Sequence, residues 1–569
     1  MKDKLIITLV NYYYIIKNLN FSAMKKLFIT LLFFSLCAGS IMKAQMTPKD
    51  KGLQEITMDV IKGQLEFLAS DWTEGRATGE KGFYLAADYV ASMFKVFGVA
   101  PAGDAGGFGR SRGFSRQPGR PAPARTYFQN FTLIENLPDG ESSFTIKKGG
   151  QDYTFEENVD YSVSRPVLSE NFEAPVVFVG YGMVDKANGI DDFAGVDVKG
   201  KVILRLTGFP GYNDIASPMY KKLIGDNQRA AYEMSRKKNE SLASLGVAGV
   251  IDITLNTDVT RRWGVYKFDY NMSPAEGNAR TNWATMRLGG KEITKTPAIY
   301  TVSERVINLI LKDSGLNIEK YEKDAATGTA KFKPVPLPGL TAAASIEIKS
   351  RRVNVRNVIA MIEGENPNEY VAIGAHLDHE GIDYGKIWNG ADDDASGTVA
   401  VMTIAKAFAA SGVKPKKTII FCAWTGEEKG LLGSEYFTLY PSAGKIGDYK
   451  FYMNFDMIAR DAANDSLKNM AGITYTKAYP KLEEITKANK DQYKLNLNLN
   501  IKSNEAPKGG SDFTAFTENK IPVIAWMAAM HPDYHQPSDQ VNLVNWNKML
   551  DIIKLGYLQL WEAANGEIK

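Results

Sequence analysis

Cysteine and histidine are both scarce in this 569-residue chain. There are two cysteines and four histidines. Only Cys422 remains if the N-terminal segment is removed, so we expect no intramolecular disulfide and interpret Cys422 as a buried core residue. The formal net charge of +3 is nearly balanced, which gives no reason to expect a nucleic-acid partner. Walker and Rossmann glycine patterns are absent as well, which excludes those two nucleotide-binding motifs.

The apolar run near the N-terminus, residues 27–36, is too short to span a bilayer as a stable anchor. It follows the basic Met24-Lys25-Lys26 and precedes small residues, a pattern typical of a signal peptide. We therefore interpret residues 1–44 as a signal peptide whose true start is Met24. We expect an exported protein, located in the periplasm, on the outer surface or outside the cell. Lipidation of Cys37 stays open, although Leu36 before it does not fit a lipobox.

The length of the chain predicts two or three domains. Residues 48–165 begin with helical periodicity and are interpreted as the N-terminal part of a main domain. Residues 166–345 carry short β-type runs bounded by Gly, Pro and Asp, which predicts an inserted β-rich domain. Residues 346–569 alternate strands and helices and complete the main domain. Residues 101–125, rich in Gly, Pro and Arg, are interpreted as an exposed, mobile loop.

The alternation after residue 353 predicts an α/β fold with a mainly parallel central sheet flanked by helices. A helix is expected over residues 397–410. Buried strands are expected where apolar runs occur, at residues 355–362, 370–375, 418–424, 451–455 and 521–528.

All four histidines lie in two short segments, residues 374–379 and 531–535. One histidine alone would be explained equally well by a structural hydrogen bond. Acidic residues, however, recur in the same setting, just past a predicted strand or in a turn before a helix. Loops at the carboxyl ends of strands in an open α/β sheet converge on one crevice, so these side chains can meet there. The residues concerned are His376, Asp393, Glu427, Glu428, Asp456 and His535.

Several carboxylates in one crevice would repel one another and resist ionisation unless cations were present. Two divalent ions would nearly balance the charge of this set. Imidazole and carboxylate ligands without thiolate suit Zn²⁺ in a catalytic site, and two ions about 3.5–4 Å apart form a hydrolytic arrangement. His379-Glu380 begins like the helical zinc motif H-E-x-x-H, but Asp383 stands at its last position. Asp392 and Asp394 are explained equally well as helix-cap or loop residues.

Five strings of the sequence resemble, in order and spacing, a known family of two-zinc exopeptidases. The family, clan MH of the metallopeptidases, includes aminopeptidase Y, bacterial leucyl aminopeptidase and glutamate carboxypeptidase. The resemblance covers about residues 353–566, and the insertion at 166–345 resembles the protease-associated domain that many members carry. The strings are GAHLDH, GADDDASG, GEEKGLLGS, NFDMI and YHQPSD.

This resemblance implies two zinc ions and assigns five residues as their ligands. His376 and Glu428 would bind different ions, and Asp393 would bridge both. Asp456 would complete the shell of the ion at His376, and His535 that of the ion at Glu428.

The resemblance also implies three roles beside the metals. Glu427 would be the general base rather than a ligand. Asp378 would hold His376 in the tautomer that binds metal. Tyr534 would hydrogen-bond the tetrahedral oxyanion, although a packing role is as good an account.

The function expected is therefore a secreted two-zinc aminopeptidase that acts on peptides through a metal-bridging hydroxide. A carboxypeptidase remains an alternative, with Arg460 as a candidate anchor for the substrate carboxylate. A glutaminyl cyclase would need only Asp393, Glu428 and His535, and a non-catalytic binding protein would need none of them. Peptides are the expected partners, without nucleic acid or a stable membrane span. Side-chain preference and oligomeric state are not indicated.

Overall fold

The computed structural model describes residues 46–105, 124–157, 159–164, 168–225, 228–254, 284–290, 293, 295–329, 332–383 and 385–569. The predicted signal peptide and most of the loop predicted at 101–125 lie outside these ranges. Within the described ranges, no helix has the length and apolar character needed to cross a membrane. The chain divides into a short unit, Met1–Lys51, in which helix α3 (Pro48–Leu53) begins, and a large unit, Gly52–Lys569. The following concerns the large unit.

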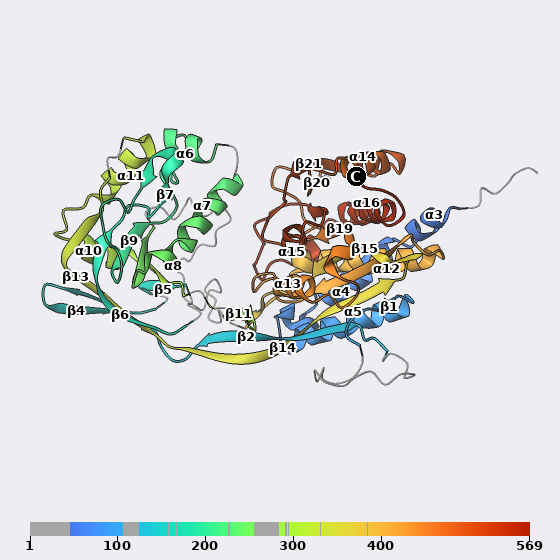
Figure 1. Cartoon of the computed structure of the whole chain (residues 1–569), viewed down its shortest axis with the longest axis horizontal. Coiled ribbons are helices and arrows are strands. Elements are labelled where there is room, and N and C mark those ends of the chain that lie inside the picture. Colours follow the sequence, from blue (N-terminus) through green and yellow to red (C-terminus); the bar gives the residue numbers. More distant parts are fainter. Residues whose placement is uncertain are drawn as a thin grey trace, which may run out of the picture. The chain divides into compact units, whose positions relative to one another are not determined.

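A ten-stranded sheet forms the centre of the main domain (Figure 1). Its strand order is β11-β2-β14-β18-β15-β19-β22-β20-β21, and β1 pairs with β14. Strands β18, β15, β19 and β22 run parallel to one another, whereas β2, β14 and β20 pair antiparallel with these or with each other. The bounds are β1 Ala100–Pro101, β2 Phe128–Pro138, β11 Thr285–Leu288, β14 Ile348–Ile362, β15 Asn366–His376, β18 Lys417–Trp424, β19 Tyr449–Phe455, β20 Met470–Thr476, β21 Asn498–Asn504 and β22 Val523–Met527. The α/β prediction is confirmed, with the parallel strands at the centre of a mixed sheet.

Helices cover both faces of this sheet, which explains why its central strands are mostly apolar. Phe421 of β18 belongs to the core under α4, α5, α12 and α16, while its neighbour Cys422 belongs to the core on the other face, under α13 and α15. Alternate residues of a strand point to opposite faces, so a strand buried on both sides has few positions that favour a polar side chain. The helices of this domain are α4 Met58–Leu68, α5 Lys81–Val96, α12 Gly397–Ser411, α13 Leu432–Leu439, α14 Lys481–Gln492, α15 Phe513–Glu518 and α16 Trp546–Asn565.

A second, eight-stranded sheet has its own hydrophobic core. Its order is β4-β3-β13-β6-β9-β10-β12-β5, with bounds β3 Ser143–Lys148, β4 Gln151–Phe155, β5 Tyr161–Val163, β6 Glu170–Phe178, β9 Val202–Leu206, β10 Gly249–Ile253, β12 Ile299–Val302 and β13 Val335–Ile346. Its helices are α6 Pro218–Leu223, α7 Gln228–Glu240, α8 Leu242–Leu245, α10 Glu304–Leu311 and α11 Ile318–Thr327, and a hairpin joins β7 Val184–Asp185 to β8 Ile190–Asp191.

Sheet membership does not follow the expected boundary at residue 166. Strands β3, β4 and β5, all before that residue, pair within the second sheet, whereas β11 at residues 285–288 pairs with β2 of the larger sheet. The short β3–β4 hairpin is polar on one face and carries no periodicity that assigns it to either sheet. Only the strand pairing decides where it belongs.

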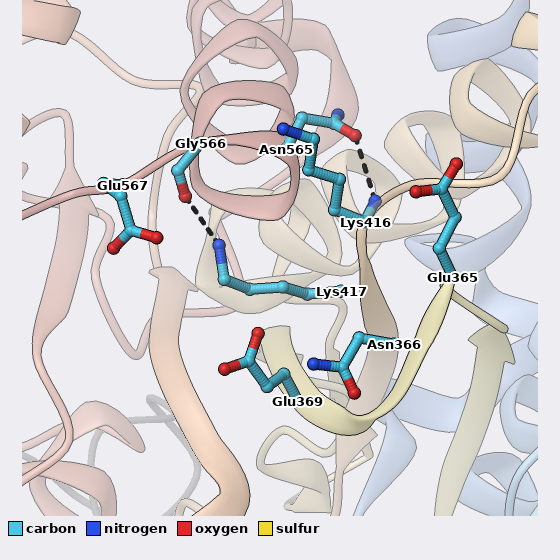
Figure 2. Close-up of a pocket in the computed structure, with 8 residues that line it drawn as sticks. All are labelled: Glu365, Asn366, Glu369, Lys416, Lys417, Asn565, Gly566 and Glu567. Atoms are coloured by element: carbon cyan, nitrogen blue, oxygen red, sulfur yellow. Dashed lines mark hydrogen bonds between the residues drawn. The ribbon is translucent and has the colours of Figure 1, made fainter.

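The C-terminal end of α16 is fastened to the start of β18 by Lys417 (Figure 2). The Lys417 ammonium donates to the carbonyl oxygens of Ala563 at 3.0 Å and Gly566 at 2.6 Å. The main-chain N–H of Lys416 donates to Asn565 Oδ1 at 3.1 Å. The last carbonyls of a helix have no partner within the helix, and a lysine near this end satisfies them and the helix dipole.

We expect Lys417→Met to lower the free energy of unfolding by about 2 kcal/mol, because charged hydrogen bonds to two carbonyls are lost while the aliphatic stem is kept. Denaturant-induced unfolding measures the change. Lys416→Met, at the neighbouring residue whose contact with α16 is made by the main chain, is the matched control and should change stability by less than about 0.5 kcal/mol. Equal losses in the two variants would contradict this account of Lys417.

Candidate metal centre

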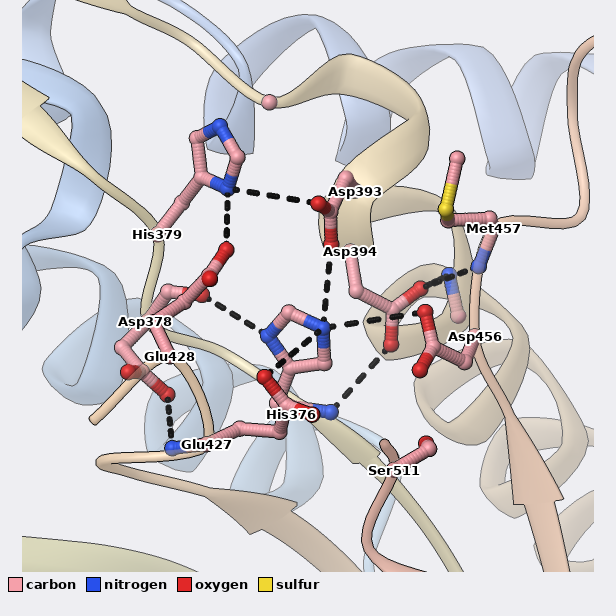
Figure 3. A network of polar contacts seen from close by, with 12 residues as sticks. His376, Asp378, His379, Asp393, Asp394, Glu427, Glu428, Asp456, Met457 and Ser511 are labelled. Carbon is pink, nitrogen blue, oxygen red and sulfur yellow. Dashed lines mark hydrogen bonds and ion pairs between the residues drawn. The ribbon is translucent and has the colours of Figure 1, made fainter. Parts of the chain in front are cut away.

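The predicted ligands meet at the carboxyl ends of the four parallel strands. His376 ends β15, Glu428 follows β18, Asp456 follows β19 and His535 follows β22. Asp393 comes from the irregular turn η4 (Ala391–Ser396) that opens α12. The convergence of these loops is a consequence of strand direction, because parallel neighbours end at the same edge of a sheet. The structure brings all five side chains together (Figure 3, which draws part of the set).

Asp393 lies between the two histidines and presents one oxygen to each. Its Oδ1 is 3.1 Å from His376 Nε2, and its Oδ2 is 3.1 Å from His535 Nε2. Asp456 Oδ1 lies 3.7 Å from His376 Nε2, and Glu428 Oε2 lies 3.1 Å from His535 Nε2. The centre thus has two halves that share Asp393. We call His376, Asp393 and Asp456 the first half-site, and Asp393, Glu428 and His535 the second half-site.

The donor atoms are close enough to one another to hold cations. His376, Asp393 and Glu428 offer atoms that all lie within 4.8 Å of each other, and so do Glu380, Glu428 and His535. His376 forms a third such group with Asp456 and Asp394. Imidazole nitrogen and carboxylate oxygen, with no sulfur, are a donor set that fits zinc.

Asp394, however, uses its carboxylate on the main chain. Its Oδ1 accepts from the N–H groups of Gly397 at 2.9 Å and Met457 at 3.2 Å, and its Oδ2 accepts from His376 N at 3.2 Å. These bonds cap α12 and tie the turn to the two neighbouring loops. The helix-cap interpretation therefore describes Asp394 better than a ligand role.

Burial and mutual repulsion dominate the electrostatics of the centre. Burial raises the pKa of Glu427 well above its usual value, and the neighbouring carboxylates Glu428 and Asp456 raise it further. Burial also disfavours the charged form of His535, but Glu428 and Asp393 outweigh it and raise the pKa of His535 to about 11. Burial and the charge of Glu428 would raise the pKa of Asp393, yet its bonds with His376 and His535 bring it below the ordinary value. The pocket favours positive charge beside Asp393.

Glu427 lies beside the first half-site without joining any of the groups of close donor atoms found among the described residues. Its Oε2 is 3.9 Å from His376 Nε2, and its main-chain N–H donates to Asp378 Oδ1 at 3.2 Å. Its side chain is 9% exposed and is therefore largely shielded from solvent. This position suits a group that takes a proton at the edge of the centre.

The structure corrects how Asp378 supports His376. The Nδ1 atom of His376 lies 2.9 Å from the main-chain carbonyl oxygen of Asp378, not from its carboxylate. The carboxylate instead accepts from Thr78 Oγ1 at 2.7 Å and from Glu427 N. A carbonyl acceptor still requires the proton on Nδ1 and leaves Nε2 to bind metal. The side chain of Asp378 therefore positions the loop of Glu427 rather than the imidazole.

Tyr534 stacks on His535, with ring centroids 3.9 Å apart and an angle of 27° between the planes. Burial raises the pKa of Tyr534, and so do the carboxylates of Asp393 and Glu428. Its hydroxyl therefore stays protonated near the centre, as a hydrogen-bond donor must. The stacking also agrees with a packing role, so both interpretations of Tyr534 stay open.

Sequence reasoning missed two residues that support the turn carrying Asp393. Asp539 Oδ2 accepts from the main-chain N–H of Asp392 at 3.0 Å and of Asp393 at 3.1 Å. The fully buried Arg76 donates to carbonyl oxygens of three separate segments, those of Leu68 at 2.6 Å, Leu377 at 2.8 Å, Asn389 at 2.6 Å and Gly390 at 3.0 Å. Asp539 ends the string YHQPSD and could have been noticed there. Arg76 stands in a turn-rich stretch with no signal of its role.

An α/β sheet with buried imidazole and carboxylate side chains gathered at its strand ends is an arrangement typical of metal-dependent hydrolases. The sequence agrees: residues 357–556 match the model of peptidase family M28. This match confirms the resemblance to the zinc exopeptidases over that part of the chain.

Curated relatives are similar to part of the chain. A probable leucine aminopeptidase 2 of Aspergillus oryzae is 33% identical over 287 residues, which cover 48% of this chain and 55% of the relative. Aminopeptidase Y of Saccharomyces cerevisiae is 28% identical over 216 residues, covering 36% of this chain and 38% of the relative. The matched parts thus span about half or less of these relatives' own length.

A solved structure covers far more of the chain. The aminopeptidase from Aneurinibacillus sp. strain AM-1 has a TM-score of 0.55 at 18% identity, over 92% of this chain and 97% of that chain. At this identity the likeness shows the fold alone, including both sheets.

We expect Arg76→Met to lower the free energy of unfolding by roughly 3–5 kcal/mol, because several buried carbonyls lose their donor. The turn carrying Asp393 should also lose its support, so metal binding should weaken. Arg352→Met, at an exposed arginine of β14, is the control and should stay within about 0.5 kcal/mol of the parent. Denaturation curves of the two variants decide the matter, and an Arg76→Met protein as stable as the control would refute the role of Arg76.

Proposed function

We propose that this protein is an exported aminopeptidase that uses two zinc ions, one in each half-site, to release residues from the N-terminus of peptides. The observation that carries the proposal is the position of Asp393, whose two oxygens each face a different histidine. A carboxylate so placed can bridge two cations, whereas a one-metal site needs only one of the two histidines. The match of residues 357–556 to family M28 and the names of the relatives support the peptidase assignment.

The protein's own residues divide the work. When bound, two zinc ions would supply polarisation of the scissile carbonyl and a water of lowered pKa. Glu427, beside the first half-site, would accept the proton of the attacking water and deliver it to the leaving amine. Tyr534 would donate a hydrogen bond to the oxyanion from its place over His535.

Arg460 favours the aminopeptidase over the carboxypeptidase. This arginine was the candidate anchor for a substrate carboxylate, but its Nη2 pairs with Asp533 and its Nη1 lies 3.6 Å from Asp539. The Arg460 side chain is 11% exposed, so a substrate carboxylate would have to displace two carboxylates, of which Asp539 is fully buried. The complete first half-site speaks against a cyclase, which would not need His376 or Asp456.

Two further parts of the proposal rest on the sequence. The basic and apolar stretch around residues 24–36 supports export, and we propose that the second sheet is the protease-associated domain expected from the resemblance. Its separate core supports an independent folding unit.

The direction of cleavage is tested by incubating the zinc-loaded protein with matched peptides that carry a free or an acetylated N-terminus. Mass spectrometry identifies the products, and we expect cleavage only of the peptides with a free N-terminus. Shortening of the acetylated peptides from the other end would support the carboxypeptidase instead. Ammonia released from a peptide with N-terminal Gln would support the cyclase.

Replacing Glu427 with Gln tests the general base. The variant should lose roughly 10²–10⁴-fold in turnover, because the amide cannot take a proton, while still holding two zinc ions. Glu365→Gln, an exposed position at the other end of the sheet, serves as the control and should keep full activity. A Glu427→Gln protein that turns over peptide within a few-fold of the parent would rule out this role.

A further inference from the structure

His379 and Glu380 follow directly on the Asp378 loop and both reach the second half-site. His379 is fully buried, and its Nδ1 lies 2.8 Å from Glu428 Oε1 (Figure 3). Glu380 Oε1 lies 3.5 Å from His535 Nδ1, and the Glu380 side chain is 9% exposed. Glu428 and His535, the two ligands that belong to this half-site alone, thus each have a contact with one of these residues, and His379 Nδ1 also lies 3.8 Å from Oδ2 of the shared Asp393.

The contact of His379 sets the orientation of Glu428. A carboxylate oxygen can only accept, so His379 Nδ1 carries the proton and donates it. This bond occupies Oε1 and leaves Oε2 directed at His535 Nε2, 3.1 Å away. His379 Nε2, which has no hydrogen-bond partner among the described residues, does not compete for this role. The hydrogen bond from His379 therefore determines which oxygen of Glu428 faces the metal position.

The contact of Glu380 sets the tautomer of His535. With a carboxylate beside Nδ1, the proton of the neutral ring is held there and the lone pair of Nε2 points to the metal position. A carboxylate acceptor also makes the imidazole a more basic ligand. The first half-site differs, because His376 Nδ1 faces the main-chain carbonyl of Asp378.

We propose that His379 and Glu380 are positioning residues that strengthen metal binding in the second half-site. The dipeptide His379-Glu380, which lacks the second histidine of an H-E-x-x-H motif, positions two metal ligands. This inference rests on the proposed two-zinc function. It adds that metal affinity in the second half-site depends on two residues outside the five predicted ligands.

The test measures zinc bound per chain, by elemental analysis, after dialysis against a series of chelator concentrations. His379→Leu removes the donor at similar volume, and Glu380→Gln is nearly isosteric. Each should lower the affinity for one of the two ions roughly 10- to 100-fold and leave the other unchanged. His379→Gln, which keeps an N–H donor, should recover part of the loss. Thermal unfolding of the zinc-free variants confirms that they fold.

Double variants identify the half-site affected. His379→Leu combined with Asp456→Asn should lose both ions, because each change weakens a different half-site. His379→Leu combined with Glu428→Gln should weaken zinc binding no more than Glu428→Gln alone, because both changes act on the same ligand. Asp393→Asn gives the reference for a change that weakens both ions together.

Three results would overturn the proposal: wild-type affinity for both ions in the single variants, equal weakening of both ions, or an additive loss of affinity with Glu428→Gln.

The proposed function fails in a different way. A wild-type protein that binds two zinc ions but cleaves no peptide would refute the aminopeptidase and leave the positioning test intact. A wild-type protein that does not bind two ions would refute both.

Discussion

Asp393 is a buried carboxylate shared by two imidazoles, and the rest of the centre is arranged around it. Its oxygens lie 3.1 Å from His376 and from His535, in a pocket that also holds Glu427, Glu428 and Asp456. Four carboxylates buried this close together are costly unless positive charge is present. This cluster of carboxylates therefore favours bound cations. Burial and the same repulsion raise the pKa of Glu427, so that this side chain can accept a proton.

The turn that presents Asp393 is irregular and is held from several sides. Asp539 binds its N–H groups, Arg76 binds its carbonyls, and Asp394 caps the helix that follows. These contacts come from segments far apart in the sequence and satisfy the main-chain groups of the turn, which would otherwise be unpaired in a buried place. A short acidic turn can thus place one carboxylate in both half-sites without regular secondary structure of its own.

The two half-sites are supported differently. A main-chain carbonyl sets the tautomer of His376, whereas side chains of one dipeptide orient both Glu428 and His535. Side-chain support can be altered by substitution, and a carbonyl cannot. In the same region Arg460 pairs with Asp533 and Asp539, so its positive charge stabilises the loop and is not free to bind a substrate.

The sequence by itself indicated the central strands, the helix after Asp393 and the ligand types, because strands buried on both faces are mostly apolar and the predicted ligands stand where such strands end. The edge strands and the limits of the second sheet were decided by pairing alone, since their short polar runs fit either sheet. The support of the ligands was also a matter of tertiary structure. His379 and Glu428 are 49 residues apart, and they meet because β15 and β18 run parallel with His376 opposite Trp424, which brings both loops to one level. Arg76 meets Asn389 across 313 residues through packing that no local pattern records.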